Sequence, residues 1–276
     1  MDAQGVTKGA SVKVIAVSVA VLLSLAAPAR AETGFLDRSV LIGGETYRYQ
    51  VYVPADYTPQ KKWPVIVALH GDGSQGSDGL LQTARGLAEQ IRQKRSQFPA
   101  IVVFPQARAG TRFMAPAAMQ DLVIAQMDQA VAEFNGDVAR LYLTGYSMGG
   151  GSVYRIAYRW PQRFAALVVI AGPIVPEPGR APAAMVELDR QANRFAAAPD
   201  PFAALAEAIV QIPIWIYHGD ADQTPPVDQA RRLVEALKKV GARYRYTELP
   251  GADHAASAQK GYGDPEMIAW LLQQHR

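Results

Sequence analysis

Residues 141–150 read Leu-Tyr-Leu-Thr-Gly-Tyr-Ser-Met-Gly-Gly. A short apolar segment runs here into the pattern Gly-x-Ser-x-Gly, and small residues suited to the first turn of a helix follow. This context predicts a sharp strand-to-helix turn that raises the hydroxyl of Ser147 above a sheet. Gly145 and Gly149 suit the turn, because strand and helix cross too closely there for side chains. The stretch predicts a nucleophilic serine, although the pattern alone also fits a glycine-rich turn that carries a serine by chance.

Apolar segments recur along the chain and alternate with segments of helical periodicity. Strands are expected at 65–69, 101–104, 141–143, 167–170, 214–217 and 244–249. Apolar stripes from Met119 to Phe134 and from Val227 to Leu237 predict helices between them. This alternation predicts an α/β fold with a doubly wound, mostly parallel sheet. Two further segments within residues 40–53, separated by Gly43-Gly44, predict an antiparallel N-terminal hairpin at the sheet edge.

Residues 173–211 interrupt the alternation with a stretch rich in proline and alanine. A connection of this length between two strands is unusual unless it has structure or function of its own. We expect a small helical cap or lid insertion, with a plain insertion as the alternative.

The N-terminal residues have the features of a secretory signal peptide. Lys8 and Lys13 precede the uncharged apolar run 14–27, and Ala29-Arg30-Ala31 forms a small-residue cleavage pattern. The run is shorter than the roughly 20 residues that span a bilayer, which argues against a permanent membrane anchor. We therefore expect cleavage near Ala31, export to the periplasm or medium, and a single domain over residues 32–276.

The composition excludes some classes of binding partner, nucleophile and metal site. The chain has 276 residues, of which 49% are hydrophobic and 19% charged, enough apolar material for a real core. Residues 1–31 carry three positive charges and one negative charge, so their removal lowers the net charge from +3 to +1. Nucleic acid is therefore not an implied partner. The chain has no cysteine, which excludes disulfides, a cysteine nucleophile and thiolate metal sites.

Three histidines follow predicted strands and could activate the serine. His70 and His218 stand at the ends of strands 65–69 and 214–217, and His254 lies in the loop after 244–249. Functional groups gather at the carboxyl ends of parallel strands. His275 lies next to the C-terminus and is a poor candidate.

Three motifs together resemble the α/β-hydrolase superfamily. The elbow 145–149 is similar to its nucleophile motif, His218-Gly219-Asp220-Ala221-Asp222 to its H-G-x-x-D turn, and Gly251-Ala252-Asp253-His254 to its base-bearing loop. The order of serine, acid and histidine is also that of the superfamily. Residues 69–73, 140–150 and 160–166 resemble secreted bacterial esterases of the feruloyl-esterase and polyhydroxybutyrate-depolymerase branch. The resemblance extends over roughly residues 38–276.

The resemblance implies a catalytic triad of Ser147, Asp222 and His254. His254 would take the proton from Ser147, and Asp222 would fix the imidazole tautomer. Asp220 is the rival acid, two residues away, and His218 would orient the acid loop. The backbone N–H groups of Met148 and Asp72 would form the oxyanion hole, with Gly71 or Gly73 as alternatives to Asp72. As substrate-binding residues we expect His70, Tyr146, Phe113 and Met114.

These features predict a serine-dependent carboxylic ester hydrolase that acts through an acyl-serine intermediate. The expected substrates are small or medium soluble esters, including aryl or feruloyl esters. Without cysteines or an appended binding domain, the chain departs from the secreted polymer depolymerases. We expect no cofactor, and His70-Gly71-Asp72-Gly73 has no accompanying ligand set that would favour a metal. A secreted peptidase of the prolyl-oligopeptidase type, a polyhydroxybutyrate depolymerase and a non-catalytic binding protein remain as alternatives.

Overall fold

The computed structural model of the chain describes Met1 and residues 32–94, 98–176 and 182–276. The predicted signal peptide, residues 1–31, lies outside the described residues except for Met1.

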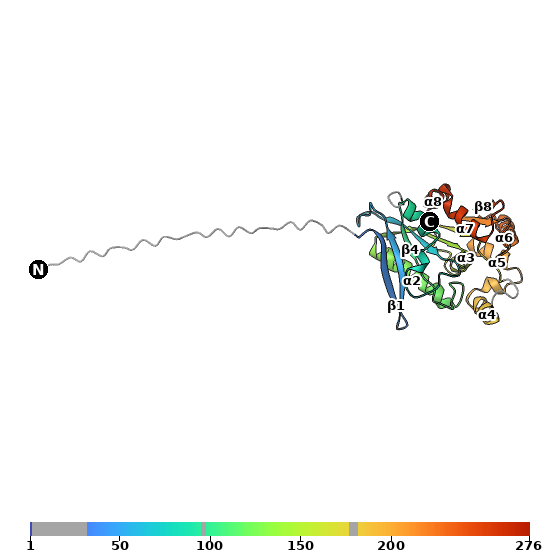
Figure 1. The fold of residues 1–276 in the computed structure, drawn as a ribbon, viewed down its shortest axis with the longest axis horizontal. Coiled ribbons are helices and arrows are strands. Elements are labelled where there is room, and N and C mark those ends of the chain that lie inside the picture. Colours follow the sequence, from blue (N-terminus) through green and yellow to red (C-terminus); the bar gives the residue numbers. More distant parts are fainter. Residues whose placement is uncertain (2–31, 95–97, 177–181) are drawn as a thin grey trace. The chain divides into compact units, whose positions relative to one another are not determined.

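A single eight-stranded sheet carries the fold, in the order β1-β2-β4-β3-β5-β6-β7-β8 (Figure 1). The strands are β1 Gly34–Ile42, β2 Glu45–Val53, β3 Trp63–Leu69, β4 Ile101–Phe104, β5 Gly136–Tyr146, β6 Ala166–Ile170, β7 Ile214–Gly219 and β8 Tyr244–Leu249. β3 to β8 run parallel to their neighbours, whereas β1 and β2 form an antiparallel hairpin whose second strand pairs antiparallel with β4. The predicted mostly parallel sheet and N-terminal hairpin are confirmed.

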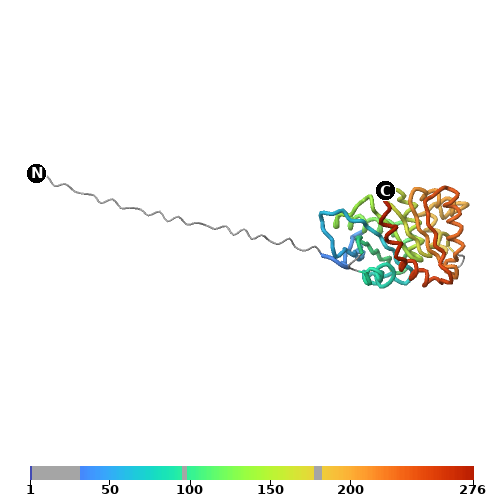
Figure 2. Tube along the Cα trace, turned by 90° about the horizontal axis from the view of Figure 1, so that it is seen from above, coloured from blue at the N-terminus to red at the C-terminus, as the bar shows by residue number. Residues whose placement is uncertain are grey.

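Helices cover both faces of the sheet. They are α1 Leu87–Gln93, α2 Ala117–Glu133, α3 Met148–Arg159, α4 Ala183–Ala192, α5 Pro201–Ile209, α6 Asp228–Lys239, α7 His254–Gly263 and α8 Pro265–Leu272, with short 3₁₀ turns at Leu81–Thr83 and Arg194–Ala197. Buried residues of α2, α3, α5 and α6 belong to one hydrophobic cluster, and those of α1, α7 and α8 to the other. The fold thus has three layers, and Figure 2 shows the chain passing from blue N-terminal strands at one side to orange C-terminal elements at the other.

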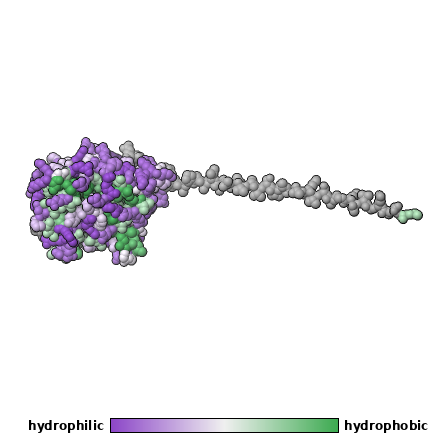
Figure 3. Space-filling model, turned by 180° about the vertical axis from the view of Figure 1, so that it is seen from behind, coloured by the Kyte–Doolittle hydropathy of each residue, from purple (hydrophilic) through white to green (hydrophobic). Residues whose placement is uncertain are grey.

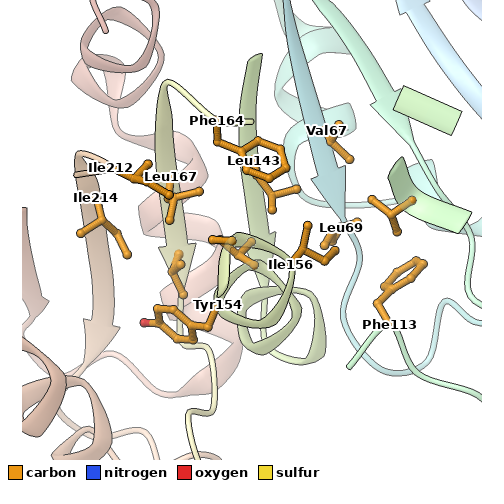
Figure 4. Packing of buried hydrophobic residues seen from close by; sticks show 14 of the residues in the cluster. Val67, Leu69, Phe113, Leu143, Tyr154, Ile156, Phe164, Leu167, Ile212 and Ile214 are labelled. Carbon is orange, nitrogen blue, oxygen red and sulfur yellow. The ribbon is translucent and has the colours of Figure 1, made fainter. Parts of the chain in front are cut away.

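The central strands are buried on both faces because their side chains alternate between the two clusters. On β3, Val65, Val67 and Leu69 point into the cluster on the α3 side, whereas Ile66 and Ala68 belong to the opposite cluster. An uninterrupted apolar strand is what a parallel sheet covered by helices requires. Figure 4 shows the α3-side cluster, in which the strand side chains face those of the helix.

The segment 173–211 has two structurally different parts. In α5, Phe202, Leu205 and Ile209 are buried in the main core, so this helix is part of the domain. In α4, Asp189 is the buried residue. The helical content agrees with the expected insertion, and its movement as a lid stays a prediction.

One face of the described part of the chain is mostly hydrophilic, with separate hydrophobic areas (Figure 3). Among the described residues, none of the helices combines the length and the apolarity needed to span a bilayer.

Candidate active site

Ser147 occupies a strained turn between β5 and α3. Its φ of +56° lies in the region that L-residues rarely adopt. A Cβ on Gly145 would lie 2.3 Å from the Gly149 carbonyl oxygen, and one on Gly149 would lie 2.2 Å from the Leu69 carbonyl oxygen. Both glycines are therefore required by close backbone approach, and the predicted elbow is present.

Two hydrogen bonds connect the serine to a histidine and the histidine to a carboxylate. The Nε2 atom of His254 lies 2.7 Å from Ser147 Oγ, and its Nδ1 atom lies 2.7 Å from Asp222 Oδ2. Since a carboxylate only accepts, Nδ1–H donates to Asp222 and Nε2 is free to accept the serine proton. The structure brings together the three side chains expected from the motifs.

The carboxylate of Asp222 is buried yet held in its charged form. Burial alone would raise the pKa of Asp222, but hydrogen bonds from His218, His254 and the Thr224 amide outweigh it and hold that pKa well below its usual range. Asp220, the rival acid, instead accepts a hydrogen bond from the Gly251 amide at 2.7 Å. Asp222 thus contacts the imidazole, whereas Asp220 ties the acid loop to the loop that carries His254.

The other two strand-end histidines support loops. Nε2 of the buried His218 lies 2.9 Å from the Pro225 carbonyl oxygen and 3.4 Å from Asp222 Oδ2, as expected for a residue that orients the acid loop. His70 accepts the Ala107 amide at Nε2 and contacts the Gly71 carbonyl through Nδ1 at 2.7 Å, which fixes the Nδ1–H tautomer. Burial lowers the pKa of His70, so this ring is a neutral support for the glycine loop.

Backbone amides at the start of α3 and in the loop after β3 lie close to the serine. Met148 opens α3, and the first intrahelical bond found after the serine runs from the Gly151 amide to the Ser147 carbonyl. The Met148 amide therefore lacks an intrahelical acceptor. A Cβ on Gly71 would lie 3.4 Å from Ser147 Cβ, so the loop that carries Asp72 passes directly beside Ser147. This arrangement suits a carbonyl oxygen held between Met148 and the 71–72 backbone.

A cavity of about 300 Å³ opens beside Ser147. Its wall is mainly apolar and includes Met114, Ala115, Met148, Val175, Met185 and Val186. Asp72 and Arg112, joined by a 2.8 Å ion pair, also line it. Residues from both the 112–115 loop and the 173–189 segment thus form the cavity.

The predicted substrate-binding residues take different positions. Met114 lines the cavity, but Phe113 is fully buried in the cluster that Figure 4 shows, and its ring lies 5.0 Å from that of His70. Phe113 therefore packs beneath the loop, which corrects its expected role, whereas His70 lines a second cavity together with Asp72 and Tyr146, and its role in substrate binding stays a prediction. Tyr146 donates through its hydroxyl to the His254 carbonyl at 3.0 Å, and burial raises its pKa to about 12. Tyr146 therefore holds the backbone of His254 in place.

Sequence reasoning did not find the charged end of the cavity. Arg155 and Asp189 line it and form a buried ion pair between α3 and α4. In the sequence both look like ordinary helical charges, 34 positions apart. The one available signal was their placement, since Arg155 follows the elbow by two helical turns and Asp189 lies in the proline-rich insertion.

Comparison with known proteins identifies the family. The sequence model of the esterase family matches residues 41–264, most of the chain. The chain belongs to the esterase family. This membership agrees with the predicted superfamily and with the α/β fold described above.

Individual relatives agree with this assignment. A bifunctional acetylxylan esterase/xylanase of Neocallimastix patriciarum is 28% identical over 127 residues, which are 45% of this chain and 18% of that protein. A thermostable esterase of known structure is 29% identical, with a TM-score of 0.69 over 88% of this chain and 63% of the other. A ferulic acid esterase at 16% identity shares the fold, with a TM-score of 0.64 over 86% and 98% of the two chains. The chain thus spans less than two thirds of the first two relatives.

Proposed function

We propose that this protein is a serine-dependent carboxylic ester hydrolase. The observation that carries the proposal is the continuous hydrogen-bonded series from Ser147 Oγ through His254 to Asp222, with both distances at 2.7 Å. A serine hydroxyl is a weak nucleophile at neutral pH and needs such an adjacent base. Membership of the esterase family supports the same chemistry.

The geometry suggests a two-stage reaction. His254 removes the proton from Ser147 as Oγ attacks the ester carbonyl carbon, and the resulting oxyanion is held by the Met148 amide and the 71–72 backbone. The imidazolium, stabilised by the Asp222 carboxylate, then protonates the leaving alcohol. Water, deprotonated by His254, attacks the acyl-serine and releases the acid while the proton returns to Ser147. Each half-reaction returns His254 to its neutral form.

The cavity supports small or medium esters as substrates. A volume of about 300 Å³ is at the lower end of the range for small-molecule sites, and its apolar wall suits a short acyl group.

Hydrolysis of p-nitrophenyl acetate and butyrate tests the proposal. We expect activity in the protein and a loss of at least ~10³-fold in kcat for Ser147→Ala. Ser39→Ala on β1, at the far edge of the sheet, is the control and should retain full activity. Unchanged activity in Ser147→Ala would contradict serine catalysis.

We also propose that the chain is exported and cleaved after Ala31, on the evidence of its charged N-terminal residues, apolar run and small-residue cleavage pattern. Mass spectrometry of the protein recovered from the medium or periplasm should give Glu32 as its first residue. Recovery of the uncleaved chain in the cytoplasm would contradict this proposal.

A further inference from the structure

The cavity beside Ser147 has two ion pairs in a mainly apolar wall, Asp72 with Arg112 and Arg155 with Asp189. Arg155 and Asp189 both line it, and their side chains are only 1% and 6% exposed. The two contacts between them are 2.7 Å for Nε to Oδ1 and 2.5 Å for the terminal nitrogen to Oδ2. Burying such a pair costs desolvation energy that a well-packed apolar pair would avoid. Its position in the cavity wall suggests that it contacts the ligand.

Arg155 has no donor left for a ligand. Its guanidinium has five N–H groups. Two are given to Asp189, two to the carbonyl oxygens of Gly151 and Pro173, and one to that of Ile174. The cavity therefore offers a carboxylate or phosphate group no cationic donor at this point.

Asp189 keeps capacity to accept. Its Oδ1 atom accepts from Arg155 Nε and from Asn193 Nδ2, the latter at 2.8 Å. Its Oδ2 atom accepts one hydrogen bond, from Arg155, among the residues that the structure describes. Since a carboxylate oxygen can accept two hydrogen bonds, Oδ2 has room for one donor from the cavity. Asp189 Oδ2 can therefore accept a hydrogen bond from a neutral or cationic donor of the ligand.

The spacing between this acceptor and the nucleophile is set by α3. Gly151, whose carbonyl binds the Arg155 guanidinium, follows Ser147 by four residues, and Arg155 follows it by eight. With a rise of 1.5 Å per residue these positions lie roughly 6 and 12 Å along the helix. An acyl group of medium length attached to Ser147 would thus bring its distal end to the ion pair. The intervening wall, with Met148 and Met185, is apolar.

We propose that the substrate's acyl group carries a hydroxyl at its distal end and that this hydroxyl donates to Asp189 Oδ2. The inference rests on the proposed ester hydrolysis and narrows it to hydroxyacyl esters. Asp189 and Arg155 then determine specificity, with the arginine holding the carboxylate in place. Acyl groups that bring a carboxylate to this ion pair are disfavoured, because Asp189 repels the carboxylate and Arg155 has no free N–H group.

Three p-nitrophenyl esters matched in size test the proposal on the unmodified protein. The heptanoate and the 6-hydroxyhexanoate differ by a methyl group in place of the hydroxyl, and the adipate monoester ends in a carboxylate. A hydrogen bond to a charged acceptor should favour the hydroxy ester by about tenfold or more in kcat/KM over the heptanoate. The adipate should be the poorest of the three. Equal or faster hydrolysis of the heptanoate overturns the inference, whereas no hydrolysis of any ester counts against the proposed function instead.

The double variant Arg155→Met/Asp189→Leu tests whether this ion pair causes the preference for the hydroxy ester over the heptanoate. It replaces the pair by apolar side chains, so the ratio of hydroxy ester to heptanoate should fall to one or below. The exposed pair Arg163 and Asp128 is the matched control, and Arg163→Met/Asp128→Leu should keep the wild-type ratio. A wild-type ratio in the Arg155/Asp189 variant overturns the assignment. If that variant does not fold, as judged by circular dichroism, the ester series on the unmodified protein decides alone.

Discussion

Replacing Gly149 by alanine should disable the site from a position that touches no substrate. A Cβ at this residue would lie 2.2 Å from the Leu69 carbonyl oxygen and 2.6 Å from the Leu69 carbonyl carbon. Real Cβ contacts essentially never fall below 3.0 Å, so β3 and α3 must separate by at least about 0.8 Å. The Ser147 hydroxyl and the Met148 amide move with α3, away from the loop after β3 that carries Asp72.

The expected magnitudes follow from that displacement. Misplacing reacting groups by ~1 Å can cost about 10²-fold in rate, and we expect a loss of that order in kcat/KM for p-nitrophenyl butyrate. Overpacking should destabilise the fold by about 1–3 kcal/mol, partly offset by the ~1 kcal/mol better helix propensity of alanine. Rates are to be normalised to the folded fraction from urea denaturation.

Gly263 in α7 provides the matched control. A Cβ there meets nothing within 4 Å, so Gly263→Ala should retain wild-type kcat/KM and be at least as stable as the wild type. Wild-type kcat/KM in Gly149→Ala would refute the reasoning that the elbow requires this close approach.

Three further variants test the site. Asp222→Asn should lower kcat for ester hydrolysis by about 10⁴-fold, because the asparagine amide can hold His254 in the wrong tautomer. A loss below tenfold would count against Asp222 as the group that fixes the tautomer. The pKa of Asp222 is lowered in the folded state, so its charge stabilises the fold above about pH 4 and this contribution fades as the pH falls further. The unmodified protein should therefore exceed Asp222→Asn in free energy of unfolding by less at pH 3 than at pH 7, as measured by urea denaturation. A difference that grows as the pH falls would contradict a stabilising charge on Asp222. Ser147→Gly should be more stable than Ser147→Ala by about 1–2 kcal/mol in the same assay, because glycine adopts φ +56° without strain and alanine does not. Equal stabilities of the two variants would show that the turn is unstrained. Tyr146→Phe removes the hydrogen bond to the His254 carbonyl and should cost about 0.5–1.5 kcal/mol of stability, and an unchanged unfolding midpoint would exclude that contribution.

The sequence predicted the central strands well because both faces of the sheet are covered. β4 at Ile101–Phe104 and β6 at Ala166–Ile170 lie within one residue of their predicted apolar segments. β5 was predicted only from Leu141 but begins at Gly136. Its first residues include Asp137 and Arg140, which pair with each other at 2.8 Å and are partly exposed, and such polar residues conceal a strand from pattern analysis.

The sequence predicted those site residues that belong to short motifs. The motif alone indicated the elbow, in which Gly145 lies against Gly149 and Gly149 lies against Leu69 of β3, and the motif order indicated the acid and the base. The cavity depends instead on contacts between distant segments. Phe113 looked like a cavity residue because its loop is apolar, but the fold buries it against His70. The Arg155–Asp189 pair joins α3 to α4 across 34 positions of sequence, and no local pattern records that contact.

Reaction with a fluorophosphonate probe followed by peptide mass spectrometry tests the central claim most directly. Such a probe bonds covalently to a serine that a neighbouring base activates. The account predicts one adduct per chain, on Ser147, and a labelling rate that falls sharply in His254→Ala, since Nε2 lies 2.7 Å from the hydroxyl. An adduct on another serine, or an active protein that leaves Ser147 unlabelled, would contradict it.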